Sequence, residues 1–309
     1  MHASCYHETD DSRISYFLKC FSPADILRCF ASLGVESIEK YGYVYPKTEK
    51  AETVAAALLN ACHQADFPVQ FFYESGQQEI SELRKSFDAV ILSCGSAACK
   101  KTGSDGSGYL YLRKLGIPYT RILPALCPLK ANADELLKDF PSKRFFGRVT
   151  VLIEGAARAS ETGEIQLRSN AVSGIPVMNV SREVSRALDT GKEVRLRLEP
   201  VTPEDLPENL RARLAAEFSS AGENSAEKTR SVFCEKTYEL PVCEISRFDE
   251  AQVCTGGVPL ESLTDTLEVK NHSGIYITGE LCDVDGICGG YNLHWAWLSG
   301  MIAGKAAAE

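Results

Sequence analysis

The chain has 309 residues, of which 44% are hydrophobic and 24% charged, so it can bury a substantial core and form two structural units. Its formal net charge of -9 and its pI near 5.3 argue against a nucleic-acid-binding surface, which would need a stripe of basic residues. No stretch approaches roughly 18 uncharged apolar residues, and residues 1–15 contain no apolar signal region. We therefore expect a cytoplasmic protein that binds neither nucleic acid nor membrane.

The first part of the chain predicts two helices and a short strand. Ser22-Pro23-Ala24-Asp25 has the composition of a helix start, and the apolar spacing that follows it ends at Gly34. Residues 41–46 predict an aromatic strand, which is either an ordinary sheet edge ended by proline or a lid over a bound cofactor. A second helix is expected over residues 47–65. Its predicted buried face consists of Val54, Ala55, Leu58, Leu59 and Cys62.

The middle of the chain predicts strands separated by loops. Residues 67–72 and 88–95 have strand composition, and a polar loop then leads into a helix over residues 108–115. Three alternating segments predict an antiparallel sheet or a small barrel, and these are residues 147–153, 164–168 and 193–198. Residues 199–230, rich in Pro, Glu, Ala, Ser and Asn, predict a surface helix with a mobile linker.

The most informative region lies near the C-terminus. Gly274-Ile275-Tyr276-Ile277-Thr278 resembles a buried strand in composition, and a helix is expected from Asn292 onward. Between them, Gly289-Gly290 opens the helix without side chains that would keep a ligand away. A helix start presents unpaired N–H groups and the positive end of its dipole, so it favours an anionic or electron-accepting group. Asp283, after the strand, can accept hydrogen bonds from ligand hydroxyls.

Three motifs resemble the BaiN/YhiN-type family of FAD-binding flavoproteins. The first comprises Thr255-Gly256-Gly257-Val258 with residues 274–297, and the second comprises residues 88–95 with the loop 102–109. The third comprises residues 163–168 with Val172-Ser173-Gly174. Members of this family, which includes aminoacetone oxidase-like proteins, are identified as NAD(P)/FAD-dependent oxidoreductases, and bile-acid enone reduction is proposed for some.

The resemblance implies an α/β fold, in which a partial FAD-binding Rossmann-like domain of the glutathione-reductase type carries an inserted, mainly antiparallel β domain. The FAD-binding domain would comprise residues 1–127 and 239–309, and the inserted domain on the substrate side would comprise residues 128–238. In the family, the aspartate matching Asp283 lies at the flavin ribityl chain, and the glycines matching Gly289 and Gly290 lie beside the pyrimidine edge of the ring. The expected cofactor-binding residues are Gly95, Gly103, Gly106, Gly257, Gly279, Glu280, Asp283, Gly289, Gly290, Tyr291 and Asn292.

The sequence lacks the unit that usually binds the ADP half of FAD. That unit is a strand, a G-x-G-x-x-G turn and a helix, because the bare turn and the helix N-terminus together hold the pyrophosphate. Residues 1–11 contain no apolar strand, and Gly103-x-x-Gly106-x-Gly108 has the wrong spacing and follows the wrong strand. Two explanations stay open: the chain has lost its ADP-binding half, or Met1 is an internal methionine taken as a start.

No catalytic constellation is evident, which is compatible with flavin chemistry because the cofactor itself carries the hydride. His294, in the first turn of the last helix, is either a hydrogen-bond partner of flavin or substrate, or an ordinary packed residue. The twelve cysteines have irregular spacing without paired C-x-x-C, so we interpret most of them as reduced core residues and expect no metal site.

The expected function follows from the resemblance. It is that of an FAD-dependent oxidoreductase with NAD(P)H as electron donor, which reduces an unsaturated or carbonyl-bearing small molecule such as a bile-acid enone. The alternative is a non-catalytic remnant, or one half of a split flavoprotein that needs a separate ADP-binding fragment.

Overall fold

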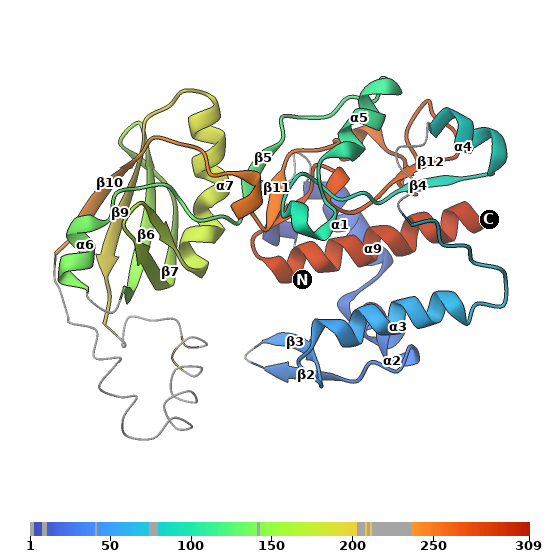
Figure 1. Cartoon of the computed structure of the whole chain (residues 1–309), viewed down its shortest axis with the longest axis horizontal. Coiled ribbons are helices and arrows are strands. Elements are labelled where there is room, and N and C mark those ends of the chain that lie inside the picture. The colour runs from blue at the N-terminus through green and yellow to red at the C-terminus, as the bar shows by residue number, and fades with distance from the viewer. Residues whose placement is uncertain are drawn as a thin grey trace.

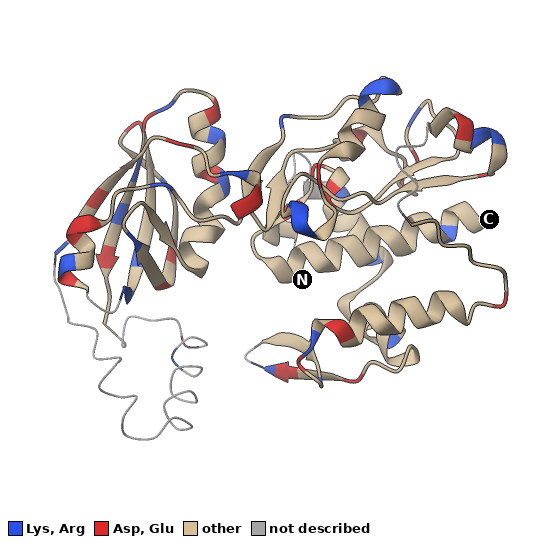
Figure 2. Cartoon of the chain, viewed as in Figure 1, with Lys and Arg blue, Asp and Glu red and all other residues tan. Residues whose placement is uncertain are grey.

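The computed structural model describes residues 3–7, 11–40, 42–73, 80–140, 143–202, 208, 211 and 236–309. It is a mixed α/β protein organised around the long C-terminal helix α9 (Gly289–Ala308), which crosses the molecule in Figure 1. Apart from Lys305 this helix carries no Lys, Arg, Asp or Glu, as Figure 2 shows. A helix without a polar face is typical of a position between packed layers. The α/β fold class expected from the sequence is confirmed.

The Rossmann-like part contains a short parallel pair of strands, β4 (Val90–Leu92) and β12 (Ile275–Ile277). Helices α4 (Ile80–Ser86) and α5 (Ser107–Lys114) belong to this part, and α9 contacts both strands. The far side of β12 is bridged by Glu268, whereas β4 has no second neighbour among the described residues. The strands predicted around residues 90 and 276 and the helix predicted at 108–115 are therefore present.

Two further strand pairs hold the segments around the candidate site. Strand β5 (Leu123–Ala125) runs antiparallel to β11 (Val253–Thr255). Strand β1 (Tyr6–His7) pairs with β13 (Asp285–Gly286), so a segment near the start of the chain lies beside the glycine-rich loop that precedes α9. Short 3-10 helices occur at Ala3–Cys5, Lys100–Thr102, Phe248–Glu250, Leu260–Ser262 and Gly279–Leu281.

The inserted part is a five-stranded antiparallel sheet with the order β10-β9-β6-β7-β8. Its strands are β6 (Arg144–Ile153), β7 (Ala156–Arg168), β8 (Ala171–Ser173), β9 (Val194–Pro200) and β10 (Tyr238–Val242). Helix α6 (Asp134–Asp139) lies at its edge, and α7 (Ile175–Asp189) packs between the sheet and the rest of the molecule (Figure 1). The expected antiparallel sheet is present, and it extends to Val242, past the boundary predicted at residue 238. The helix and linker predicted over 199–230 lie almost wholly outside the described residues.

The lobe beneath α9 in Figure 1 contains α2 (Pro23–Ser32) and the hairpin of β2 (Ser37–Lys40) with β3 (Tyr43–Pro46), whereas α1 (Asp11–Cys20) lies outside this lobe and contacts α9. The predicted start of α2 is confirmed, because Ser22 and Asp25 form a reciprocal capping box. Gly34 ends this helix with a φ of +82°, which glycine adopts without strain. Strand β3 is largely exposed and pairs only with β2 among the described strands.

Two predictions about the next segment are wrong. Helix α3 (Ala51–His63) forms as expected, but none of its residues is buried, and Leu58 and Leu59 are 41% and 43% exposed. Residues 67–72 form no strand, and Phe67 and Phe72 are exposed. Apolar spacing suffices to predict a helix, but burial needs a neighbouring element, and on the predicted face only Val54 packs, half-buried, against the core.

The sequence predicted that most cysteines are reduced core residues, but only a minority of the described cysteines lie in the core. Among the described cysteines, which are all free, only Cys127, Cys254 and Cys282 are buried. No group of three His, Cys, Asp or Glu side chains that could hold a metal ion occurs within the described part of the chain. Over the same residues, no helix combines the length and apolarity that crossing a bilayer requires.

Candidate flavin-binding site

Asp283 lies in the loop between β12 and β13, and its side chain is only 5% exposed. Its Oδ2 accepts a hydrogen bond from Thr120 Oγ1 at 2.8 Å, and Thr120 in turn accepts one from the Gly257 N–H at 3.0 Å. Its backbone N–H donates to the Val258 carbonyl at 2.8 Å. Burial raises the pKa of the carboxyl group, while the hydrogen bond from Thr120 opposes that shift. The hydrogen bond from Thr120 and the backbone hydrogen bond to Val258 therefore fix the position of this carboxylate.

The second oxygen of Asp283 has no partner. Within the described residues, only three buried side-chain polar atoms lack a hydrogen bond: Arg13 Nε, Asp283 Oδ1 and His294 Nε2. Two of the three belong to residues that the sequence selected for the site. Because an unpaired buried polar atom costs about 1–3 kcal/mol, such atoms are rare and often indicate where a ligand binds.

The N-terminus of α9 provides a second open surface. Its N-cap residue, Cys288, forms no side-chain cap, and the N–H groups of Gly289 and Gly290 make no hydrogen bond to the described residues. A Cβ atom placed on Gly290 would meet no atom within 4 Å, and one on Gly289 would meet only Gln252 Oε1 at 3.8 Å. Free donors at a positively polarised helix end, with empty space before them, suit an electron-accepting ring.

The side chains of Asn292 and Glu280 form hydrogen bonds within the protein and thereby stabilise the glycine-rich loop. The amide of Asn292 accepts from the Gly286 N–H at 3.0 Å and donates to the carbonyls of Gly286 and Cys288 at 3.1 and 3.0 Å. Glu280 Oε1 accepts from Ser96 Oγ at 3.1 Å and from the Cys254 N–H at 3.0 Å. These hydrogen bonds hold the glycine-rich loop and the ends of β4 and β11 in a fixed geometry.

The remaining predicted glycines differ in their surroundings. Gly257 lies where two backbone segments cross, because a Cβ atom there would stand 2.6 Å from the carbonyl carbon of Cys282. Gly106 donates its N–H to Ser96 O at 3.0 Å, which brings the first glycine-rich loop toward Gly95 and Glu280. Gly103 is exposed and bonds only to Lys100 within its own turn, so the structure does not bring it to the site.

His294 is almost completely buried, and its Nδ1 lies 2.8 Å from the Tyr6 hydroxyl. Burial lowers the pKa of His294 to about 4, so the imidazole is neutral at pH 7. Tyr6 also packs edge-to-face on Tyr291, with the ring centroids 5.7 Å apart. His294 is therefore a buried residue near the start of α9 that contacts Tyr6, and its catalytic role stays a prediction.

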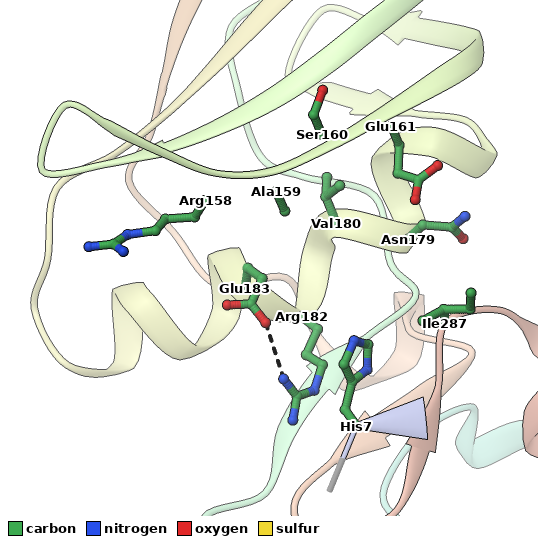
Figure 3. Close-up of a pocket in the computed structure, with 10 residues that line it drawn as sticks. All are labelled: His7, Arg158, Ala159, Ser160, Glu161, Asn179, Val180, Arg182, Glu183 and Ile287. Atoms are coloured by element: carbon green, nitrogen blue, oxygen red, sulfur yellow. Dashed lines mark hydrogen bonds and ion pairs between the residues drawn. The ribbon is translucent and has the colours of Figure 1, made fainter. Parts of the chain in front are cut away.

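A cavity of about 250 Å³ lies between the inserted sheet and the loop after β13. Its lining residues are His7, Arg158, Ala159, Ser160, Glu161, Asn179, Val180, Arg182, Glu183 and Ile287 (Figure 3). Beneath it the buried carboxylate of Asp285 binds two of these side chains at once. His7 Nδ1 lies 3.0 Å from Asp285 Oδ2, and Arg182 Nε lies 3.0 Å from the same oxygen.

His7 and Arg182 were not selected from the sequence. His7 lies in a two-residue strand without a recognisable motif, so nothing local indicates its role. Arg182 lies on α7, and the spacing of Val177, Val180 and Val184 would have predicted an amphipathic helix with Arg182 off its apolar face. Even so, only the packing of α7 reveals that Arg182 meets Asp285.

The residues present fit the flavin part of FAD. Asp283 offers an unpaired acceptor for a ribityl hydroxyl, and α9 offers free N–H groups beside a space without side chains. The sequence contains no turn of the kind that cradles the pyrophosphate. The Rossmann-like fold, the unpaired Asp283 oxygen and the free N–H groups of α9 together place the chain in the class of flavin-binding α/β proteins.

Comparison with known proteins assigns the family. Residues 2–306 match the HI0933-like protein Rossmann domain, and the chain belongs to this family of FAD-binding flavoproteins. It is 34% identical over 361 positions to the 3-dehydro-bile acid delta(4,6)-reductase of Clostridium scindens, a match that covers 100% of the chain and 86% of the relative. A 50-residue segment, 16% of the chain, is 46% identical to 12% of the ribosomal RNA dihydrouridine synthase of Escherichia coli. At the level of the family, the chain is an FAD-dependent oxidoreductase.

Proposed function

We propose that this oxidoreductase takes electrons from NAD(P)H and reduces an unsaturated or carbonyl-bearing small molecule, with an enone as the reacting group. The 3-dehydro-bile acid delta(4,6)-reductase of Clostridium scindens supports this substrate class, because the match to the chain covers 86% of that relative. The observation that carries the proposal is the buried, unpaired Oδ1 of Asp283 in the loop that leads to the bare start of α9. When bound, a flavin supplies hydride transfer between donor and substrate.

The residues of the chain have separate tasks in this proposal. Asp283 Oδ1 accepts a hydrogen bond from a ribityl hydroxyl, which stabilises the cofactor in one orientation. The N–H groups of Gly289 and Gly290, with the helix dipole behind them, stabilise negative charge on the pyrimidine edge of the reduced ring. Asn292 keeps the loop in the conformation that exposes these donors.

The cavity next to Asp285 is the proposed substrate site. It adjoins the loop that leads to Gly289, and it is enclosed on its other side by β7 and α7 of the inserted part (Figure 3). A substrate there would lie between the cofactor loop and the antiparallel sheet. The lining combines polar and apolar surface in similar shares, which suits a substrate that carries a carbonyl group on an apolar frame.

A second candidate function, one half of a split flavoprotein, is favoured by the open edge of β4. Parallel strands are normally covered on both faces and flanked by further strands, whereas β4 pairs only with β12 among the described strands. Ile91 of β4 is 38% exposed, and the largely exposed apolar side of α3 belongs to the same cofactor-binding part. A separate polypeptide with a G-x-G-x-x-G unit would add a parallel strand at this edge and supply the pyrophosphate contacts.

Titration of the purified chain with FAD, and with FMN in parallel, tests both candidates. If the chain itself holds the ADP half, FAD should bind at least tenfold more tightly than FMN, and NADH or NADPH should then reduce the bound flavin. Equal affinities would mean that the chain contacts only the flavin half, which supports the split form. Failure to bind either flavin would contradict the first proposal, and co-purification with a separate G-x-G-x-x-G fragment would then test the split form.

A further inference from the structure

His7 is held in a defined orientation beside the candidate flavin loop. It stands directly opposite Asp285 in the β1–β13 pair, and its Nδ1 is 3.0 Å from Asp285 Oδ2. In Figure 3 its ring points from β1 toward α7, and the side chain is 30% exposed, so the ring is in reach of solvent. With Nδ1 directed at a carboxylate, Nε2 is the atom left for a molecule in the cavity.

Asp285 is fixed more firmly than His7. Its side chain is 3% exposed, and it binds Arg182 Nε as well as the imidazole. The two partners come from different parts of the chain, α7 and β1, so the carboxylate cannot turn away without leaving the buried Arg182 Nε without its acceptor. A carboxylate fixed in this way selects the imidazole tautomer that carries its proton on Nδ1.

Charged groups reach this region from each element around it. They are Arg158 and Glu161 on β7, Arg182 and Glu183 on α7, and Asp285 on β13. Three carboxylates therefore accompany two guanidinium groups, and Arg182 Nη1 is itself paired with Glu183 Oε1 at 3.1 Å (Figure 3). A positive charge on His7 has compensating negative charge nearby.

We infer that His7 is the catalytic proton donor for the reduction, and that Asp285 is the residue that positions it. This inference rests on the proposed function. Reduction of a C=C bond conjugated to a carbonyl needs one hydride and one proton. A bound reduced flavin would supply the hydride for the β-carbon, and it would be oxidised as the C=C bond is reduced. The proton leaves His7 Nε2 and forms the C–H bond at the α-carbon, and the neutral imidazole then regains a proton from solvent.

The cavity also limits the substrate. Its volume of about 250 Å³ and its mixed polar and apolar lining match a compact molecule that carries a carbonyl group on an apolar frame. The relevant chemistry is an α,β-unsaturated carbonyl whose α-carbon reaches Nε2 of His7.

One part of the test needs no flavin. In the full-length chain with ¹⁵N-labelled histidines, His7 should show a proton on Nδ1 when neutral, and Asp285→Asn should weaken that preference. The resonance is assigned by its loss in His7→Gln. A neutral His7 with its proton on Nε2 would overturn the positioning role of Asp285.

The other part separates hydride chemistry from proton delivery. The flavin-loaded chain is reduced with dithionite and mixed with 2-cyclohexenone as probe or with ferricyanide, which accepts electrons without a proton from the cavity. His7→Gln should slow oxidation by the enone about 100-fold or more and leave oxidation by ferricyanide unchanged. The wild-type rate with the enone should fall as pH rises, and the variant should lose this dependence. His63→Gln, an exposed histidine on α3, is the matched control.

Each outcome has a distinct meaning. An enone rate within twofold of wild type in His7→Gln would overturn the proton-donor role alone. The same slowing with ferricyanide would also overturn it, because the variant would then have damaged the flavin site in general. A wild-type chain that reacts with ferricyanide but not with the enone would overturn the proposed enone reduction, and the role of His7 with it.

Discussion

Arg182 Nε lies 3.0 Å from Asp285 Oδ2, although 103 residues separate them in the sequence. The side chains are 11% and 3% exposed, so solvent hardly screens the pair. Arg182 belongs to the helix that covers the inserted sheet, and Asp285 belongs to the loop that leads to α9. This contact therefore ties the antiparallel sheet to the cofactor loop.

The first prediction concerns that contact. Asp285→Ala should destabilise the chain by about 1–3 kcal/mol, because the buried Arg182 Nε loses its acceptor while Glu183 still pairs with Nη1. Replacing both residues, as Arg182→Met with Asp285→Ala, should cost less than the sum of the two single changes. Urea unfolding measures both, and Glu82→Ala, which removes an exposed pair with Lys85, is the control with an expected loss below about 1 kcal/mol. Additive losses would show that the pair is not coupled.

The second prediction concerns flavin affinity. Asp283→Ala should weaken flavin binding by about 1–3 kcal/mol, because a ribityl hydroxyl loses its charged acceptor. Fluorescence titration measures this, and Asp249→Ala, at an exposed aspartate paired with Arg247, serves as control. Unchanged affinity in Asp283→Ala would contradict the placement of the ribityl chain.

The third prediction concerns the open space before α9. Gly290→Val should abolish flavin binding without lowering the melting temperature, because the new side chain occupies space in which no protein atom lies within 4 Å. Gly304→Val is a matched control, since Gly304 is in the same helix and a Cβ atom there also meets nothing within 4 Å. If both variants bind flavin like the wild type, the ring does not lie at the start of α9.

The fourth prediction concerns pH. Burial lowers the pKa of His294 from 6.5 to about 4, so the unfolded chain binds a proton at a higher pH than the folded chain does. The stability that depends on neutral His294 is therefore fully present above pH 6.5 and is lost as pH falls toward 4. His294→Gln should reduce the loss between pH 7.5 and 4.5 by about 2 kcal/mol in urea unfolding. An identical pH dependence in the variant would show that His294 is protonated as easily in the folded chain.

Local sequence signals predicted much of the fold. The capping residues Ser22 and Asp25, the β-branched run at 275–277 and the glycines before α9 all specify structure through their own backbone and nearest neighbours. The burial of α3 was predicted wrongly, because an apolar face does not indicate what covers it. The helical face that carries Arg182 was not recognised as part of a site, since its partner is 103 residues away.

By itself, the sequence determined the class of fold, the family resemblance and the candidate residues Asp283, Gly289 and Gly290, because glycine spacing and strand composition act over a few residues. Only the tertiary structure decided which polar side-chain atoms have a hydrogen-bond or ion-pair partner. Thr120 occupies one oxygen of Asp283 and leaves the other free, Tyr6 meets His294, and Asp285 joins His7 to Arg182. Hydrogen bonds and charges depend on distances of about 3 Å between side chains, and those distances arise only when remote segments pack together.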